Sequence, residues 1–299
     1  MNQETCNLCP RNCKTDRKNA VGFCGAGPSP TVAKVMLHQW EEPCICYGKG
    51  SGAIFFSGCQ LKCVFCQNSS ISRTVSGKEL NGDTLYQLFK SLEESGACNI
   101  NLVSPTPYTD TIIFALEKAK ASGLSIPVVF NSGGYESVQT LKRLEGLVDI
   151  YLPDFKFYSA VLSKEYAMAE NYAACCSSAI VEMYRQTGKP KWEGKHLESG
   201  LIVRHLILPN HAGDSIDVLN ALAKLVPAED IILSLMRQYT PMVDPVRFPK
   251  LARTLTSLEY NRVLKECERL GFANVYTQDR QSAGESYVPD FSIFFDKTN

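Results

Sequence analysis

The sequence lacks a surplus of charge of either sign. Lysine plus arginine and aspartate plus glutamate both number 31 among 299 residues, and the formal net charge is +0 at pH 7. Without a surplus, no overall field attracts nucleic acid or an anionic membrane, and recognition of a charged partner has to be local. Nucleic acid is therefore a disfavoured substrate.

Long apolar runs are also missing. No segment reaches the roughly 20 apolar residues of a membrane helix, and the N-terminal stretch MNQETCNLCP is polar. We therefore expect a cytoplasmic protein without membrane contact. In a chain of this size, 13 cysteines favour metal binding over a disulfide framework.

Three of the cysteines form a CxxxCxxC motif. Cys59, Cys63 and Cys66 follow directly after the apolar run 53–56. Thiolates are the usual ligands of iron–sulfur clusters, and three of them leave one iron of a four-iron cubane open to a small chelating molecule. The alternatives are a zinc site, which usually needs a fourth ligand, and a group of buried thiols.

A second group of cysteines lies near the N-terminus. Cys6, Cys9, Cys13 and Cys24 supply four thiolates, enough for a closed zinc site or a second iron–sulfur cluster, and their spacing does not choose between the two. Separate free thiols are the alternative. We assign residues 1–47 to a cysteine-rich metal-binding extension and residues 48–299 to the main domain.

Beyond residue 47, apolar runs alternate with amphipathic segments of helical length, which predicts an α/β fold with a parallel sheet of six βα units. The expected strands are 53–57, 99–104, 126–131, 148–153, 201–208 and 230–236, with 273–277 as an edge strand. The expected helices are 83–95, 109–122, 136–145, 159–187, 214–225 and 256–270.

Polar residues follow or end several of these strands. Asn131, Ser132, Asp154, Lys156 and Arg204 all lie in such positions. Sites in βα folds form at the carboxyl ends of the strands, and a charge within an apolar strand, such as Arg204, is rarely buried without a partner. These residues are therefore candidates for a shared site.

The cysteine triplet, with the aromatic Phe65 before its last cysteine, resembles the radical S-adenosylmethionine (SAM) superfamily. The runs 38–43, 151–156 and 204–209 are similar to a largely uncharacterised subfamily related to the pyruvate formate-lyase activating enzyme. The resemblance extends from Cys6 to at least Gln278. It implies the partial (β/α)6 barrel of the radical SAM core, preceded by the cysteine-rich extension.

The resemblance also implies a radical SAM oxidoreductase. In such enzymes a reduced 4Fe–4S cluster cleaves bound SAM to methionine and a 5'-deoxyadenosyl radical, which abstracts a hydrogen atom. The electron comes from a protein such as flavodoxin or ferredoxin. An activase-like member would act on a glycyl radical enzyme, whereas a stand-alone enzyme would modify a small molecule or peptide. A non-catalytic electron carrier is the remaining alternative.

By the same resemblance, Cys59, Cys63 and Cys66 hold the cluster. Phe65 lies against the SAM adenine, and Asn131 contacts SAM.

Ser132 is a further SAM contact that the resemblance implies. Asp154 and Lys156 match an Asp-x-Lys pattern in which the aspartate helps to bind a monovalent cation next to SAM. Arg204 matches an arginine that contacts SAM, a role that suits a fixed cation.

The sequence departs from the family in one place. A Gly-Gly-Glu type motif commonly binds the SAM amino group after the second strand, but residues 103–107 read Val-Ser-Pro-Thr-Pro. The acceptor here is expected to be Thr106 or backbone carbonyls.

Overall fold

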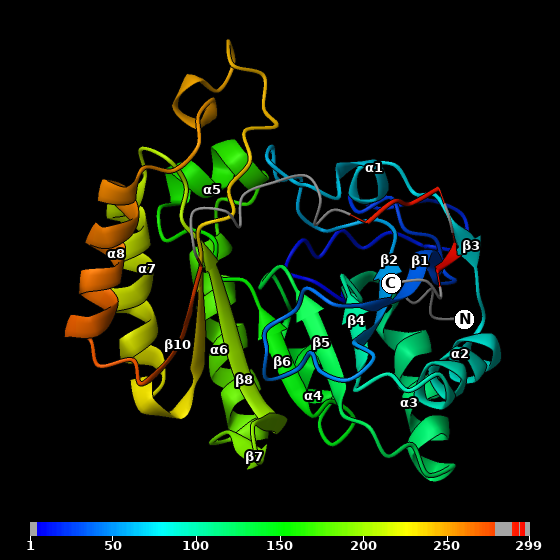
Figure 1. Cartoon of the computed structure of the whole chain (residues 1–299). Coiled ribbons are helices and arrows are strands. Elements are labelled where there is room, and N and C mark those ends of the chain that lie inside the picture. Colours follow the sequence, from blue (N-terminus) through cyan, green and yellow to red (C-terminus); the bar gives the residue numbers. More distant parts are fainter. Residues whose placement is uncertain (1–4, 279–288, 293, 297–299) are drawn as a thin grey trace.

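The computed structural model describes residues 5–278, 289–292 and 294–296, and its centre is one large sheet (Figure 1). The strand order is β10-β9-β8-β6-β5-β4-β2-β1-β11. The strands are β1 (Thr31–His38), β2 (Ser51–Phe56), β4 (Ile100–Val103), β5 (Val128–Ser132), β6 (Ile150–Pro153), β8 (His196–Leu206), β9 (Ile232–Met236), β10 (Asn274–Thr277) and β11 (Phe295–Asp296). The short strands β3 (Lys78–Glu79) and β7 (Lys191–Glu193) pair with β1 and β8.

From β2 to β10, neighbouring strands are parallel and, apart from the short β3 and β7, follow chain order. The helices between them are α2 (Gly82–Glu94), α3 (Thr109–Ala121), α4 (Val138–Lys142), α5 (Ala160–Ala167), α6 (Tyr172–Thr187), α7 (Ala212–Leu225) and α8 (Ser257–Arg269), and α1 (Ser69–Ser72) is a single turn. Right-handed crossovers place such helices on one face of the sheet. None of the described helices is both long and apolar enough to cross a membrane.

The mixed α/β architecture with a central sheet is confirmed, and all the expected strands are present. The expected helix 159–187 is two helices, because the chain turns at Met168, whose φ is 56°. The strand β1 was missed, since it lies in the segment assigned to the extension and contains a lysine. Lys34 is buried, and its Nζ donates to the carbonyl of Asp290 at 2.6 Å.

The two faces of the sheet are covered differently. Successive side chains of a strand point to opposite faces, and residues such as Phe130 and Tyr151 belong to the large cluster formed with the helices. On the other face, Ile150 packs in a second cluster with Cys44 and Ile45. The connection between β1 and β2 therefore fills the face that the helices leave open.

We expect Ile45→Ala to lower the free energy of unfolding by about 2–5 kcal/mol, the usual range for removing a buried aliphatic side chain. Ile45 is 1% exposed, whereas Leu258 is 81% exposed. The matched control Leu258→Ala should change stability by less than about 0.5 kcal/mol. Urea unfolding of both variants tests this, and equal effects would show that the connection contributes no core packing.

Candidate functional site

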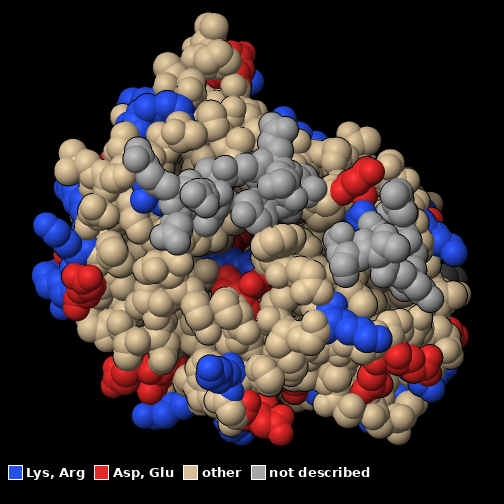
Figure 2. Space-filling model, viewed as in Figure 1, with Lys and Arg blue, Asp and Glu red and all other residues tan. Residues whose placement is uncertain are grey.

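A cavity of about 410 Å³ opens at the carboxyl ends of the parallel strands. The register brings these ends level, since Val103 lies opposite Asn131 and Arg204 lies opposite Ser234, while Asp154 bridges to Arg204. Figure 2 shows a hollow near the centre of the molecule, with acidic and basic side chains at its base. The predicted residues that line the cavity are Cys59, Cys63, Phe65, Cys66, Asn131, Ser132, Asp154, Lys156 and Arg204.

The three cysteines of the triplet share one wall of this cavity. Burial raises the pKa of the Cys59 thiol to about 11 and that of Cys63 to about 12. Without metal, these thiols therefore keep their protons at neutral pH, and a metal would have to displace them. A set of three thiols next to an open cavity fits a cluster with one free iron.

Lys156 lies beside these thiols and is paired with Asp154. Burial alone would lower the pKa of Lys156, but Asp154 and then Cys63 outweigh burial and raise it above its ordinary value. The ammonium therefore stays charged and offsets negative charge on bound thiolates. Nζ of Lys156 donates to Oδ2 of Asp154. The monovalent cation expected beside Asp154 stays a prediction.

Arg204 lines the cavity but is held by two carboxylates. Its Nε donates to Glu42 Oε1 at 2.7 Å, its Nη2 donates to Glu42 Oε2 at 2.6 Å, and Nη2 also pairs with Glu41. Burial alone would lower the pKa of Arg204, but Glu42 and Glu41 raise it well above its ordinary value. At Glu42, burial acts to raise the pKa, but Arg204 outweighs burial and holds it below the usual range.

Glu41 and Glu42 were not among the predicted site residues. The signal that could have found them is Arg204 itself, because a charge in an apolar strand needs a partner. That partner lies 162 residues earlier in the chain, which the sequence pattern does not reveal. With two carboxylates facing one guanidinium, the cavity floor carries one excess negative charge.

The remaining residues that were expected to contact SAM are Phe65, Asn131 and Ser132, and all three line the cavity. The ring of Phe65 lies edge-on to Phe157 and Tyr239, with centroids 6.1 and 6.2 Å away. Asn131 and Ser132 end β5 at the cavity wall. Strand alternation separates Arg204 from the next residue, His205. His205 is buried, and its Nδ1 donates to the carbonyl of Phe155 at 2.6 Å.

Thr106 lies outside this cavity, which corrects its expected role. Its hydroxyl donates to Glu136 Oε1 at 2.9 Å and accepts from Gln60 Nε2 at 3.2 Å. Burial raises the pKa of Glu136 to about 7. Backbone carbonyls are left as the expected acceptor for an amino group here, and Ser104, at a left-handed φ of 59°, lines the cavity where they would lie.

The N-terminal cysteines line a separate, smaller cavity. Cys6, Cys9, Cys13 and Cys24 surround it, and Thr106 closes one side. Burial raises the pKa of the Cys9 thiol to about 12. The structure thus brings together all four thiols that the sequence grouped.

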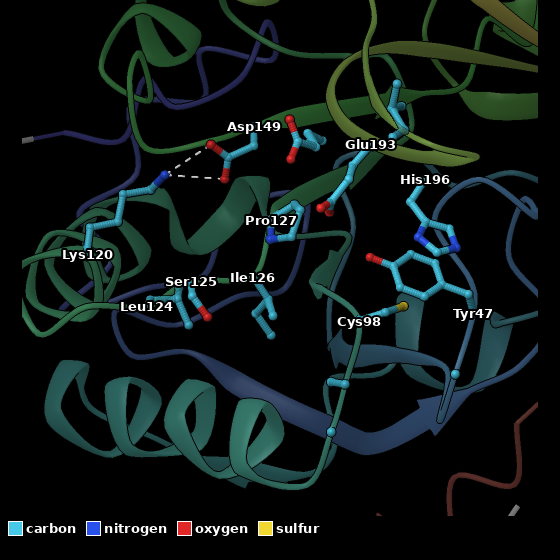
Figure 3. Close-up of a pocket in the computed structure, with 15 residues that line it drawn as sticks. Tyr47, Cys98, Lys120, Leu124, Ser125, Ile126, Pro127, Asp149, Glu193 and His196 are labelled. Carbon is cyan, nitrogen blue, oxygen red and sulfur yellow. Dashed lines mark hydrogen bonds and ion pairs between the residues drawn. The ribbon is translucent and has the colours of Figure 1, made fainter.

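A third cavity, of about 470 Å³, lies at the opposite ends of the strands. Figure 3 shows the ring of Tyr47 facing that of His196, with Lys120 paired to Asp149. Although this cavity is larger, ligands in parallel α/β sheets bind outside the carboxyl ends of the strands. The triplet cavity is therefore the candidate active site.

No protein-family model matches the chain. The chain is 28% identical over 283 residues to the uncharacterized protein MJ0674 of Methanocaldococcus jannaschii, covering 91% of this chain and 77% of that protein. Among solved structures it is similar to HydG, a maturase of the FeFe-hydrogenase, with a TM-score of 0.49 and 14% identity, over 73% of this chain and 48% of that chain. The chain thus spans about half the length of HydG, and a likeness this distant assigns neither family nor substrate.

We expect Arg204→Met to lower the free energy of unfolding by about 3–5 kcal/mol at pH 7, because it leaves buried carboxylates unpaired. In the native protein the lowered pKa of Glu42 contributes stability above the ordinary glutamate pKa, and that contribution disappears on acidification. In the variant, burial raises the pKa of Glu42 instead. The difference in the free energy of unfolding between the variant and wild type should therefore narrow as the pH falls toward about 4.3.

Urea unfolding at several pH values measures this difference. The control is the double variant Arg204→Met with Glu42→Gln, which removes one of the two stranded charges and should recover part of the stability. A loss that is the same at every pH would contradict the buried-charge explanation.

Proposed function

We propose that this protein is a radical SAM enzyme. The observation that carries the proposal is that the three thiols of the CxxxCxxC triplet share one cavity with Asn131 and with the Asp154–Lys156 pair, at the carboxyl ends of parallel strands. The bound cluster, once reduced, would supply the electron that cleaves SAM to a 5'-deoxyadenosyl radical. The curvature of the sheet into a partial (β/α)6 barrel belongs to the same proposal.

The residues around the cavity have separate roles in this proposal. Cys59, Cys63 and Cys66 hold three irons, and Lys156 offsets the charge of the thiolates. Phe65 supports the adenine of SAM from an aromatic cluster that excludes water. The fold encloses the reaction, which protects a reactive radical from stray hydrogen donors.

Arg204 takes a more limited role than the one that the resemblance implies. Its Nε and Nη2 are engaged by Glu41 and Glu42, while Nη1 has no hydrogen-bond partner among the described residues. Only Nη1 is left to approach SAM. We therefore propose that Arg204 mainly fixes the floor of the cavity.

For the substrate, we propose an activase-like reaction in which the radical abstracts hydrogen from a backbone glycine of a glycyl radical enzyme. The likeness of the motifs to activating enzymes supports it, with flavodoxin or ferredoxin as the class of electron donor. A stand-alone enzyme with a small-molecule or peptide substrate is the second candidate. The excess negative charge of Glu41 and Glu42 over Arg204 favours a cationic substrate in that case.

The test is release of 5'-deoxyadenosine by anaerobically reconstituted, reduced protein supplied with SAM. We expect release from wild type and, for Cys63→Ala, only the level of a sample without protein. The control Cys267→Ala, a buried thiol of α8 far from the triplet in sequence, should retain release. Failure of a wild-type sample with a full, reduced cluster to cleave SAM would overturn the enzyme proposal.

A further inference from the structure

The four N-terminal thiols form a preassembled site that the proposed reaction does not use. Cys6, Cys9, Cys13 and Cys24 line one small cavity. Cys6, Cys9 and Cys24 are partly buried and Cys13 is exposed. Four thiols gathered in this way are typical of a metal site that is held closed by the protein.

Two arginine donors face the same cavity without partners. Nη2 of Arg11 and Nε of Arg17 are buried and have no hydrogen-bond acceptor among the described residues, and both arginines line the cavity. A buried donor without an acceptor is unfavourable, because it has lost its hydrogen bonds to water. The donors therefore indicate an occupant that accepts hydrogen bonds and carries negative charge.

The spacing of the sulfurs favours a cluster over zinc. Zinc holds four sulfurs about 2.3 Å from one centre, whereas in a cubane each thiolate binds a different iron and the sulfurs lie farther apart. In the part of the chain that the structure describes, no three His, Cys, Asp or Glu side chains are grouped tightly enough to hold a single ion. Neither the N-terminal set nor the triplet is therefore gathered around the position of a single ion. In addition, the sulfides of a cluster accept hydrogen bonds, as the two arginine donors require.

The loop of this site packs directly on the loop of the triplet. Gly58 has a left-handed φ of +87°, and a Cβ there would lie 2.9 Å from the carbonyl oxygen of Cys24. On the other side of Cys59, the carbonyl of Gln60 accepts a hydrogen bond from Arg11 Nε at 3.0 Å. Cys59 is therefore flanked on both sides by residues that touch the N-terminal site.

We propose that Cys6, Cys9, Cys13 and Cys24 bind a second 4Fe–4S cluster, closed by four protein thiolates, immediately next to the cluster of the triplet. Arg11 and Arg17 donate hydrogen bonds to its sulfurs, and such bonds raise the reduction potential of a cluster. With no open iron, this cluster does not bind SAM. The assignment is independent of whether the triplet cluster cleaves SAM.

The first experiment counts metals in anaerobically reconstituted full-length protein. We expect about eight irons per chain in wild type, and about four both in Cys9→Ser with Cys24→Ser and in Cys59→Ser with Cys63→Ser and Cys66→Ser. The control Cys267→Ser should keep about eight. Zinc retained by the triplet variant and lost from the N-terminal variant would overturn the assignment, as would a triplet variant without iron.

The second experiment tests the contact by electron paramagnetic resonance of the reduced proteins. Two neighbouring reduced clusters should interact, so the wild-type spectrum should be broader than the sum of the spectra of the two variants. A wild-type spectrum equal to that sum would overturn the adjacency. Added SAM should change the spectrum of the N-terminal variant and leave that of the triplet variant unchanged.

These outcomes separate the two proposals. A missing SAM effect in the N-terminal variant, with four irons present, counts against the proposed function alone. A triplet variant that is folded by circular dichroism but binds no iron counts against the second cluster alone.

Discussion

The ion pairs of Arg204 with Glu41 and Glu42 are the interaction on which the rest of this structure depends. They join the eighth strand to the connection between the first two strands, across 162 residues of sequence. All three side chains are buried or nearly so, with 16% of Arg204, 5% of Glu41 and 6% of Glu42 exposed. A buried pair is not necessarily favourable against an apolar replacement, but losing one partner is strongly unfavourable. The connection is therefore held in one position against the face of the sheet.

This constraint explains how the sheet carries a cavity at one end. The helices cover one face of the sheet. On the other face, Cys44 and Ile45 of the connection between β1 and β2 pack against the strands. The carboxyl ends of the strands then remain open above a charged floor. Asn131, Asp154 and Arg204 become neighbours there because the strand register aligns them. The site is thus a consequence of packing on the face that the helices leave bare.

Local patterns made much of the fold predictable. Runs such as 126–131 are apolar because strands of a parallel sheet are buried on both faces, and this signal is contained in a few neighbouring residues. The strand β1 escaped notice because Lys34 interrupts its apolar run, and its partner is the backbone of Asp290. Thr106 was misplaced for a similar reason: Glu136 and Gln60, which engage its hydroxyl, are distant in sequence.

By itself, the sequence determined the cysteine sets, the order of the parallel strands after residue 47, and the polar residues at the ends of these strands. These are properties of short segments, set by ligand spacing and by the period of buried residues. Only the tertiary structure decided that Glu41 and Glu42 hold Arg204, and that Cys24 packs against Gly58 beside Cys59. The physical reason is that both contacts join segments far apart in the chain, and their energies depend on burial that exists only once the sheet has formed.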